Sequence, residues 1–140
     1  MSATPEKLVE RFYHEVWNKA DEQVAKEILA EDFRFRGSLG PEKSGQDGFI
    51  EYMLSIHKAL ADYQCIIEDL VTTDSRATAR MTFKGIHQAE LFGIEATGKE
   101  IKWAGAAFFT VKDGRLAELW VLGDIDSIKQ QLSNNTSSSF

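Results

Sequence analysis

An acidic residue at the end of an apolar strand is the first candidate for chemistry in this chain. The segment LAELWVLGDIDSI, residues 116–128, runs through apolar residues and then places Asp124 where another apolar side chain would fit. Strand alternation puts Trp120, Leu122 and Asp124 on one side. A carboxyl group in apolar surroundings favours its protonated form, which suits general acid and base catalysis near neutral pH. The same residues also allow Asp124, or Asp126, to act only as the cap of the helix that follows.

Histidine is the second candidate for proton transfer. Alternation along the predicted strand 76–88 places His87 on its inward face, where it could assist an acid or serve as a packed, hydrogen-bonded core residue. His14 and His57 are predicted to be solvated residues on helix surfaces. None of the histidines forms a close pair with another histidine or with Cys65, so the sequence predicts no zinc or iron site. A lone cysteine also excludes an internal disulfide and favours a reducing compartment.

Composition limits the class of protein. A chain of 140 residues with 43% hydrophobic residues has the length and apolar content of one globular domain. Its 16 basic and 22 acidic residues give a net charge of −6, which argues against a nucleic-acid partner. The longest apolar run, residues 103–111, is too short to span a bilayer, and charged residues occupy the N-terminal region. We therefore expect a soluble, cytoplasmic protein with no membrane partner.

The elements that would position these residues begin with helices. Thr4 and Pro5 form a helix start, and an apolar stripe continues through Trp17. Asp21 begins a short second helix, a strand containing Phe33 follows, and apolar spacing marks a third helix over residues 49–60. Segments rich in β-branched, aromatic or alternating residues then predict strands at 64–73, 76–88, 100–112 and 115–123.

Helices followed by a long meander predict an α+β fold. We expect a cone-shaped, curved antiparallel sheet wrapped around the N-terminal helices, with an interior pocket at its mouth. Residues 1–132 would form this domain, and the polar segment 133–140 would be a disordered tail. The last two strands are apolar on both faces, so the outer face needs a second cover, and a homodimer through that face is predicted.

The order of elements resembles the nuclear transport factor two-like superfamily, and the sequence resembles its SnoaL-like polyketide cyclase or ester cyclase branch. The similarity covers nearly the whole folded chain. It is carried by LVERFYHEVWNKAD at residues 8–21, GQDGF at 45–49, GIHQAELFGIEATGKEIKWAG at 85–105 and DGRLAELWVLGD at 113–124. The family often has prolines before the Thr-Gly pair, where this chain has Glu95 and Ala96.

The resemblance implies a cofactor-free cyclase or isomerase. Asp124 matches the family's acidic residue, which acts as general acid and base in enolate chemistry on a hydrophobic carbonyl substrate of the polyketide or ester type. Family cyclases can carry a histidine on the neighbouring strand, and that position falls on Ala107, so His87 is the histidine left to assist. Substrate folding is assigned to four aromatic residues, which could equally be core: Trp17, Phe33, Trp103 and Trp120.

Two other functions remain open at this stage. The same cone could be a non-catalytic dimer that binds a small hydrophobic ligand, and Ala107 favours this alternative because the family's histidine ring is missing. A hydrolase or dehydratase could use the same pocket, because an acid in apolar surroundings does not define one reaction.

Overall fold

The structure is a computed structural model and describes residues 4–133 of the chain. The predicted tail therefore lies outside the described residues from 134 onward, whereas Ser133 is the last residue of a helix. In chain order the elements are α1 (Pro5–Arg11), the π-helix η1 (Phe12–Trp17), α2 (Glu22–Ile28), β1 (Leu29–Arg36), β2 (Glu42–Ser44), α3 (Gly45–Ala59), β3 (Leu60–Thr72), β4 (Arg76–His87), β5 (Glu100–Lys112), β6 (Arg115–Gly123) and α4 (Ile125–Ser133).

The strands form one sheet in the order β2-β1-β6-β5-β4-β3. The predicted meander is present, because β3 to β6 pair antiparallel with their neighbours in sequence. The predicted α+β cone is confirmed, but the sheet is mixed, not purely antiparallel, since β1 pairs with β6 in parallel. Parallel neighbours need a long connection between them. The chain between β1 and β6 provides one, because it runs through β2, α3 and β3 to β5.

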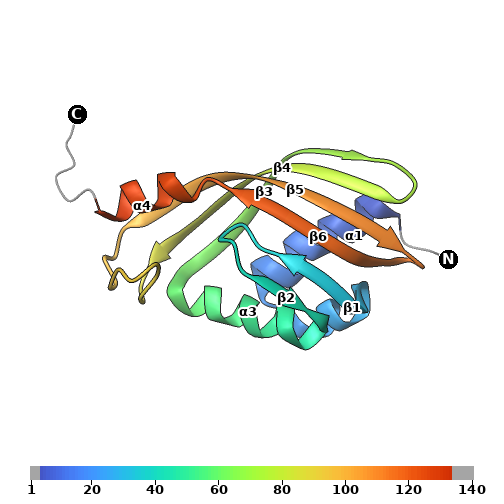
Figure 1. Cartoon of the computed structure of the whole chain (residues 1–140), viewed down its shortest axis with the longest axis horizontal. Coiled ribbons are helices and arrows are strands. Elements are labelled where there is room, and N and C mark those ends of the chain that lie inside the picture. Colours follow the sequence, from blue (N-terminus) through green and yellow to red (C-terminus); the bar gives the residue numbers. More distant parts are fainter. Residues whose placement is uncertain (1–3, 134–140) are drawn as a thin grey trace.

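The sheet curves around its helices. α3 contacts both β1 and β3, which lie near opposite edges of the sheet, and α1 contacts β3, β4 and β6. Figure 1 shows the long strands arching over α1 and α3, with α4 at one end. The helices therefore fill the concave side and leave the convex side open.

Alternation along the strands builds the core. In β4 the residues that share the face of His87 are buried and the residues between them are exposed or partly exposed, so the inward face predicted for His87 is confirmed. These buried residues are Ala77, Ala79, Met81, Phe83, Gly85 and His87. The helices contribute an aromatic cluster in which Phe12 packs against Phe33, Phe49 and Phe109 with ring centroids 5.4 to 6.4 Å apart.

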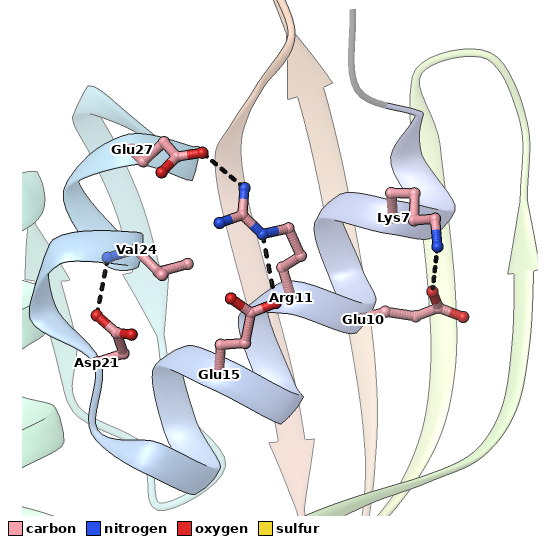
Figure 2. Close-up of polar contacts among 7 residues, drawn as sticks. All are labelled: Lys7, Glu10, Arg11, Glu15, Asp21, Val24 and Glu27. Carbon is pink, nitrogen blue, oxygen red and sulfur yellow. Dashed lines mark hydrogen bonds and ion pairs between the residues drawn. The ribbon is translucent and has the colours of Figure 1, made fainter.

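Polar contacts fix the N-terminal helices (Figure 2). The Asp21 carboxylate accepts a hydrogen bond from the Val24 amide at 3.1 Å and caps α2 as predicted. Arg11 lies between two acids, 2.7 Å from a Glu27 oxygen and 3.4 Å from a Glu15 oxygen. The hydrogen bond from Arg11 lowers the pKa of Glu27. The ion pair between these two residues links α1 to α2 at the surface.

A π-helix interrupts the first helical region at residues 12–17. Runs of π-helix are rare, and they occur often at functional sites because the wider turn changes which side chains share a face. At its end, the Asn18 side chain accepts from the Cys65 amide at 2.7 Å and donates to the Cys65 carbonyl at 3.0 Å. This pair of bonds fixes η1 against β3.

Apolar side chains remain on the convex face of β5 and β6. Phe108 is 40% exposed, Trp120 47% and Leu122 54%, and the rings of Phe108 and Trp120 lie 6.0 Å apart across the strand pair. The expectation that these strands are apolar on both faces is confirmed. Within residues 4–133, no helix is both long and apolar enough to cross a membrane, and the cytoplasmic location stays a prediction.

Candidate functional site

A cavity lies inside the cone, between the helices and the concave face of the sheet. Its walls are mostly aromatic and aliphatic, and they come from η1, β1, α3, β3, β4 and β6. The lining residues are Tyr13, Trp17, Phe35, Ser38, Leu39, Tyr52, Ile56, Tyr63, Phe83, Leu119 and Val121. An enclosed apolar space with a few hydroxyl groups is the usual form of a small-molecule site.

The cavity is narrow in this conformation. The centre of a water-sized sphere can move through only about 10 Å³ of it, which is about the room that one water needs. Two lining residues, Ser38 and Leu39, belong to the loop between β1 and β2, and the loop is held by bonds from the Gly37 amide to Pro41 and from the Gly40 amide to Gly37. A ligand larger than one water therefore requires the walls to move. Ser38 and Leu39 are the lining residues that lie outside helices and strands, so their loop is the wall segment held least by secondary structure.

The buried tyrosines differ in their polar surroundings. The Tyr63 hydroxyl interacts with the Cys65 thiol two residues along β3, and this interaction contributes to the raised pKa of Tyr63. The Tyr13 hydroxyl oxygen is fully buried and has no partner among the described residues. Burial raises the pKa of both hydroxyl groups and of the Cys65 thiol, because a charge inside this apolar region would be poorly solvated. All three groups therefore stay protonated near neutral pH.

The structure places Asp124 outside the cavity. Its side chain is exposed, and its Oδ1 atom accepts a hydrogen bond from the Ser127 amide at 3.1 Å, so it caps α4. The prediction that its carboxyl group faces the interior of the cone is wrong. The alternative stated from the same sequence, a helix cap, describes its geometry.

A β-bulge explains this error. Thr110 of β5 pairs with Glu118 and Val111 pairs with Leu116, so β6 has one extra residue, Ala117, at this point. The extra residue changes the phase of alternation: Leu116 is buried, and beyond the bulge Leu119 and Val121 are the residues that point inward.

Trp120 is consequently on the convex face, and its predicted place in the substrate pocket is also wrong. Its ring lies below the Arg36 guanidinium, with 5.0 Å between the guanidinium carbon and the ring centroid. Trp120, Leu122 and Asp124 do follow one side of the strand direction, as predicted, but that side is the outer one.

The other three predicted aromatics are interior. Trp17 lines the cavity, and its role in ligand binding stays a prediction. Phe33 is fully buried against Phe12 and Phe49 and is not among the lining residues, where its neighbour Phe35 appears instead. Trp103 is buried behind the cavity wall. Its ring packs 5.5 Å from Phe83 and 6.1 Å from Tyr63, which both line the cavity.

His87 points inward and is fully buried, as predicted. Its Nδ1 atom accepts from the Thr97 amide at 3.2 Å, which places the ring proton on Nε2, and Nε2 has no partner among the described residues. His87 is not among the lining residues of the cavity, so a catalytic role stays a prediction. His57 is not simply solvated: its Nε2 donates to the Trp17 carbonyl at 2.7 Å and its ring stacks on Trp17.

The lining offers donors but no evident base. Ala107, which matches the family's histidine position, is fully buried on the concave side of β5 and brings only a methyl group. The lining residues include neither a carboxylate nor an imidazole. Within residues 4–133, no group of three or more histidine, cysteine or acidic residues is arranged to hold a metal ion.

Sequence reasoning missed the tyrosines that line the cavity. Tyr13 was assigned only to a general apolar stripe, and Tyr63 lay outside the predicted strand, which began one residue later. The alternation of Leu60, Tyr63 and Cys65 is broken by a register shift between Ala61 and Gln64, so simple period-two counting could not identify this face.

A curved sheet around helices, with an aromatic cavity inside, defines the nuclear transport factor two-like class of cone folds. The family model described as SnoaL-like polyketide cyclase matches residues 7–132, and the chain therefore belongs to that family. No match was found among curated protein sequences.

Solved structures agree with this fold. A protein from Jannaschia sp. CCS1, provisionally named a SnoaL-like polyketide cyclase, is similar with a TM-score of 0.84 at 16% identity, covering 96% of this chain and 98% of the other. TsrD from Streptomyces laurentii gives 0.81 at 25% identity, covering 91% and 93%. A protein from Bacillus cereus ATCC 10987, provisionally named a polyketide cyclase, gives 0.74 at 28%, covering 90% and 78%.

Proposed function

We propose that this chain binds a small hydrophobic carbonyl compound, of the polyketide or ester type, in the cavity inside the cone. The observation that carries the proposal is the aromatic lining of the cavity, with Trp17, Tyr13 and Tyr63 at its walls. Apolar walls would supply most of the affinity through the hydrophobic effect, and a small number of hydroxyl groups would orient the ligand.

Binding would widen the cavity. Because the free space is about that of one water, a bicyclic ligand must displace part of the wall. The Gly37–Pro41 loop is the segment proposed to move, since its hydrogen bonds among Gly37, Gly40 and Pro41 are internal and would survive a movement of the loop as a unit.

A SnoaL-like cyclase or isomerase is the second candidate, and family membership favours it. A base would remove an acidic proton next to one carbonyl group, and the resulting enolate would attack a second carbonyl. The protonated base would then return its proton to the new alkoxide. This chemistry needs no cofactor. It does need a base, and the cavity lining contains neither a carboxylate nor an imidazole, so we rank ligand binding first.

We also propose that the protein acts as a homodimer through the convex face of β5 and β6. Three neighbouring apolar side chains, Phe108, Trp120 and Leu122, are each at least 40% exposed there. Contiguous exposed apolar side chains of this kind are typical of interaction surfaces.

Binding is tested by titration calorimetry with bicyclic and tricyclic aryl ketones and esters, of which 1-tetralone is the smallest. The discriminating variant is Val121→Ile, which adds one methylene group to the cavity wall, with Val71→Ile as the matched control on an exposed site of β3. Filling so narrow a space should weaken binding about 5-fold or more, and the control should bind like the unaltered protein. Absence of saturable binding across the panel, or equal weakening in both variants, would contradict the proposal.

A further inference from the structure

Tyr13 carries a buried hydroxyl group that no described residue satisfies. The residue is 1% exposed, and its ring makes edge-to-face contacts with the rings of Phe12 and Phe109, with centroids 5.1 and 5.9 Å away. The ring lines the cavity, and the hydroxyl oxygen has no hydrogen-bond partner among residues 4–133. The position of the hydroxyl group is therefore set by packing and not by a polar contact.

An unpaired buried hydroxyl group is costly. Leaving such a group without a partner destabilises a protein by roughly 1–3 kcal/mol, and phenylalanine would keep the same ring shape without that cost. Tyr63 provides the comparison within the same cavity, because it is 4% exposed, its hydroxyl group interacts with the Cys65 thiol, and it is not among the buried side chains without a partner. Polar groups that break the rule of internal satisfaction are expected at functional sites.

We infer that the Tyr13 hydroxyl group donates the hydrogen bond that holds the oxygen of the ligand, and that this bond makes the cavity select carbonyl compounds over hydrocarbons of the same shape. The inference rests on the proposed function, because it assigns the polar contact of that same cavity. A ketone or ester oxygen only accepts hydrogen bonds, so it complements a donor that has no other acceptor.

The protonation state of Tyr13 agrees with a donor role. Burial raises the pKa of its hydroxyl group well above the ordinary value, so the proton stays on the oxygen throughout the pH range of ordinary assays. The same bond would strengthen if negative charge developed on the ligand oxygen during enolate formation, because a fixed donor in apolar surroundings stabilises an oxyanion. Trp103 and His87 also have unpartnered buried nitrogens, but they are not among the lining residues, and the inference does not need them.

The test compares Tyr13→Phe with Tyr63→Phe in the full chain. Affinity is measured by calorimetry for 1-tetralone and for tetralin, which lacks the carbonyl oxygen, and the melting temperature of each free variant is recorded. Tyr13→Phe should weaken 1-tetralone binding by roughly 3- to 10-fold, leave tetralin binding unchanged and keep or raise the melting temperature. Tyr63→Phe should lower the melting temperature, because it removes a hydroxyl group that interacts with the buried Cys65 thiol.

Infrared spectroscopy of carbonyl-labelled 1-tetralone bound to the unaltered protein gives a measurement independent of any variant. A carbonyl stretch at lower frequency than in an alkane solvent supports the hydrogen bond, and an unshifted band contradicts it. Two outcomes would refute the inference about Tyr13 while the proposed function stands. In the first, both compounds bind but Tyr13→Phe leaves the ratio of their affinities unchanged. In the second, Tyr13→Phe lowers the melting temperature as much as Tyr63→Phe does. If neither compound, nor the wider panel, binds the unaltered protein, the proposed function fails and the inference fails with it.

Discussion

The capping geometry of Asp124 predicts a clear difference between two substitutions. Asp124→Ala removes the oxygen that accepts from the Ser127 amide, whereas Asp124→Asn keeps an oxygen in the same place. Loss of a helix cap costs about 1 kcal/mol, and asparagine is as good a cap as aspartate. The cost should reach global stability because α4 is anchored: Ile128 is fully buried, and the Gln131 side chain bonds both the amide and the carbonyl of Lys102.

The size of the effect follows from the size of the domain. Unfolding entropy is about 2.1 cal/mol/K per residue, so for residues 4–133 a loss of about 1 kcal/mol lowers the melting temperature by about 4 °C. Scanning calorimetry should show this drop for Asp124→Ala and a change of about 1 °C or less for Asp124→Asn. Asp126→Ala is the control, because this exposed acid in the first turn of α4 accepts a hydrogen bond from the exposed Gln130 side chain and does not cap the helix, so its loss should change the melting temperature little.

A different pattern would refute the capping account. If Asp124→Asn raised the melting temperature, Asp124 would behave as a costly carboxylate in apolar surroundings. If alanine and asparagine were equally destabilising, the carboxylate charge and not the cap would be important.

Two further predictions concern the convex face and the buried thiol. Leu122→Arg should convert the proposed dimer into monomers or insoluble protein in light scattering, while Lys84→Arg should do little, and a monomer for the unaltered protein at micromolar concentration would reject the dimer. Burial raises the pKa of the Cys65 thiol, so Cys65 should react with a disulfide reagent at pH 8 only after unfolding in denaturant. Complete labelling of the folded protein within minutes would contradict the buried environment of Cys65.

The parts of the fold that depend on local pattern were predictable from the sequence. The helix start at Thr4-Pro5, the Asp21 cap and the inward face of β4 all follow from capping chemistry or from strict alternation, and the structure has each of them. The parallel pairing of β1 with β6 was not predictable, because it joins segments about 85 residues apart, such as Arg34 and Glu118, and has no local signature.

The predicted site failed where one residue changes the phase of a strand. The bulge at Ala117 reverses the inside and outside of β6 for every residue after it, and nothing in the local sequence distinguishes Ala117 from a regular strand residue. Because Trp120 is apolar, it was predicted to face the interior of the cone. The structure places its side chain on the exposed apolar surface of the convex face. The π-helix that brings Tyr13 and Trp17 to the cavity was also outside what helical periodicity predicts.

The three tryptophans allow the central claim to be measured in one experiment. Trp17 lines the cavity, Trp103 lies behind its wall and Trp120 is on the convex face. Protein labelled with 5-fluorotryptophan, with its fluorine resonances assigned by single substitutions to phenylalanine, is titrated with 1-tetralone. Binding inside the cone predicts a saturable shift that is largest for Trp17, smaller for Trp103 and absent for Trp120. A shift confined to Trp120, or no saturable shift at Trp17, would contradict a ligand in the cavity.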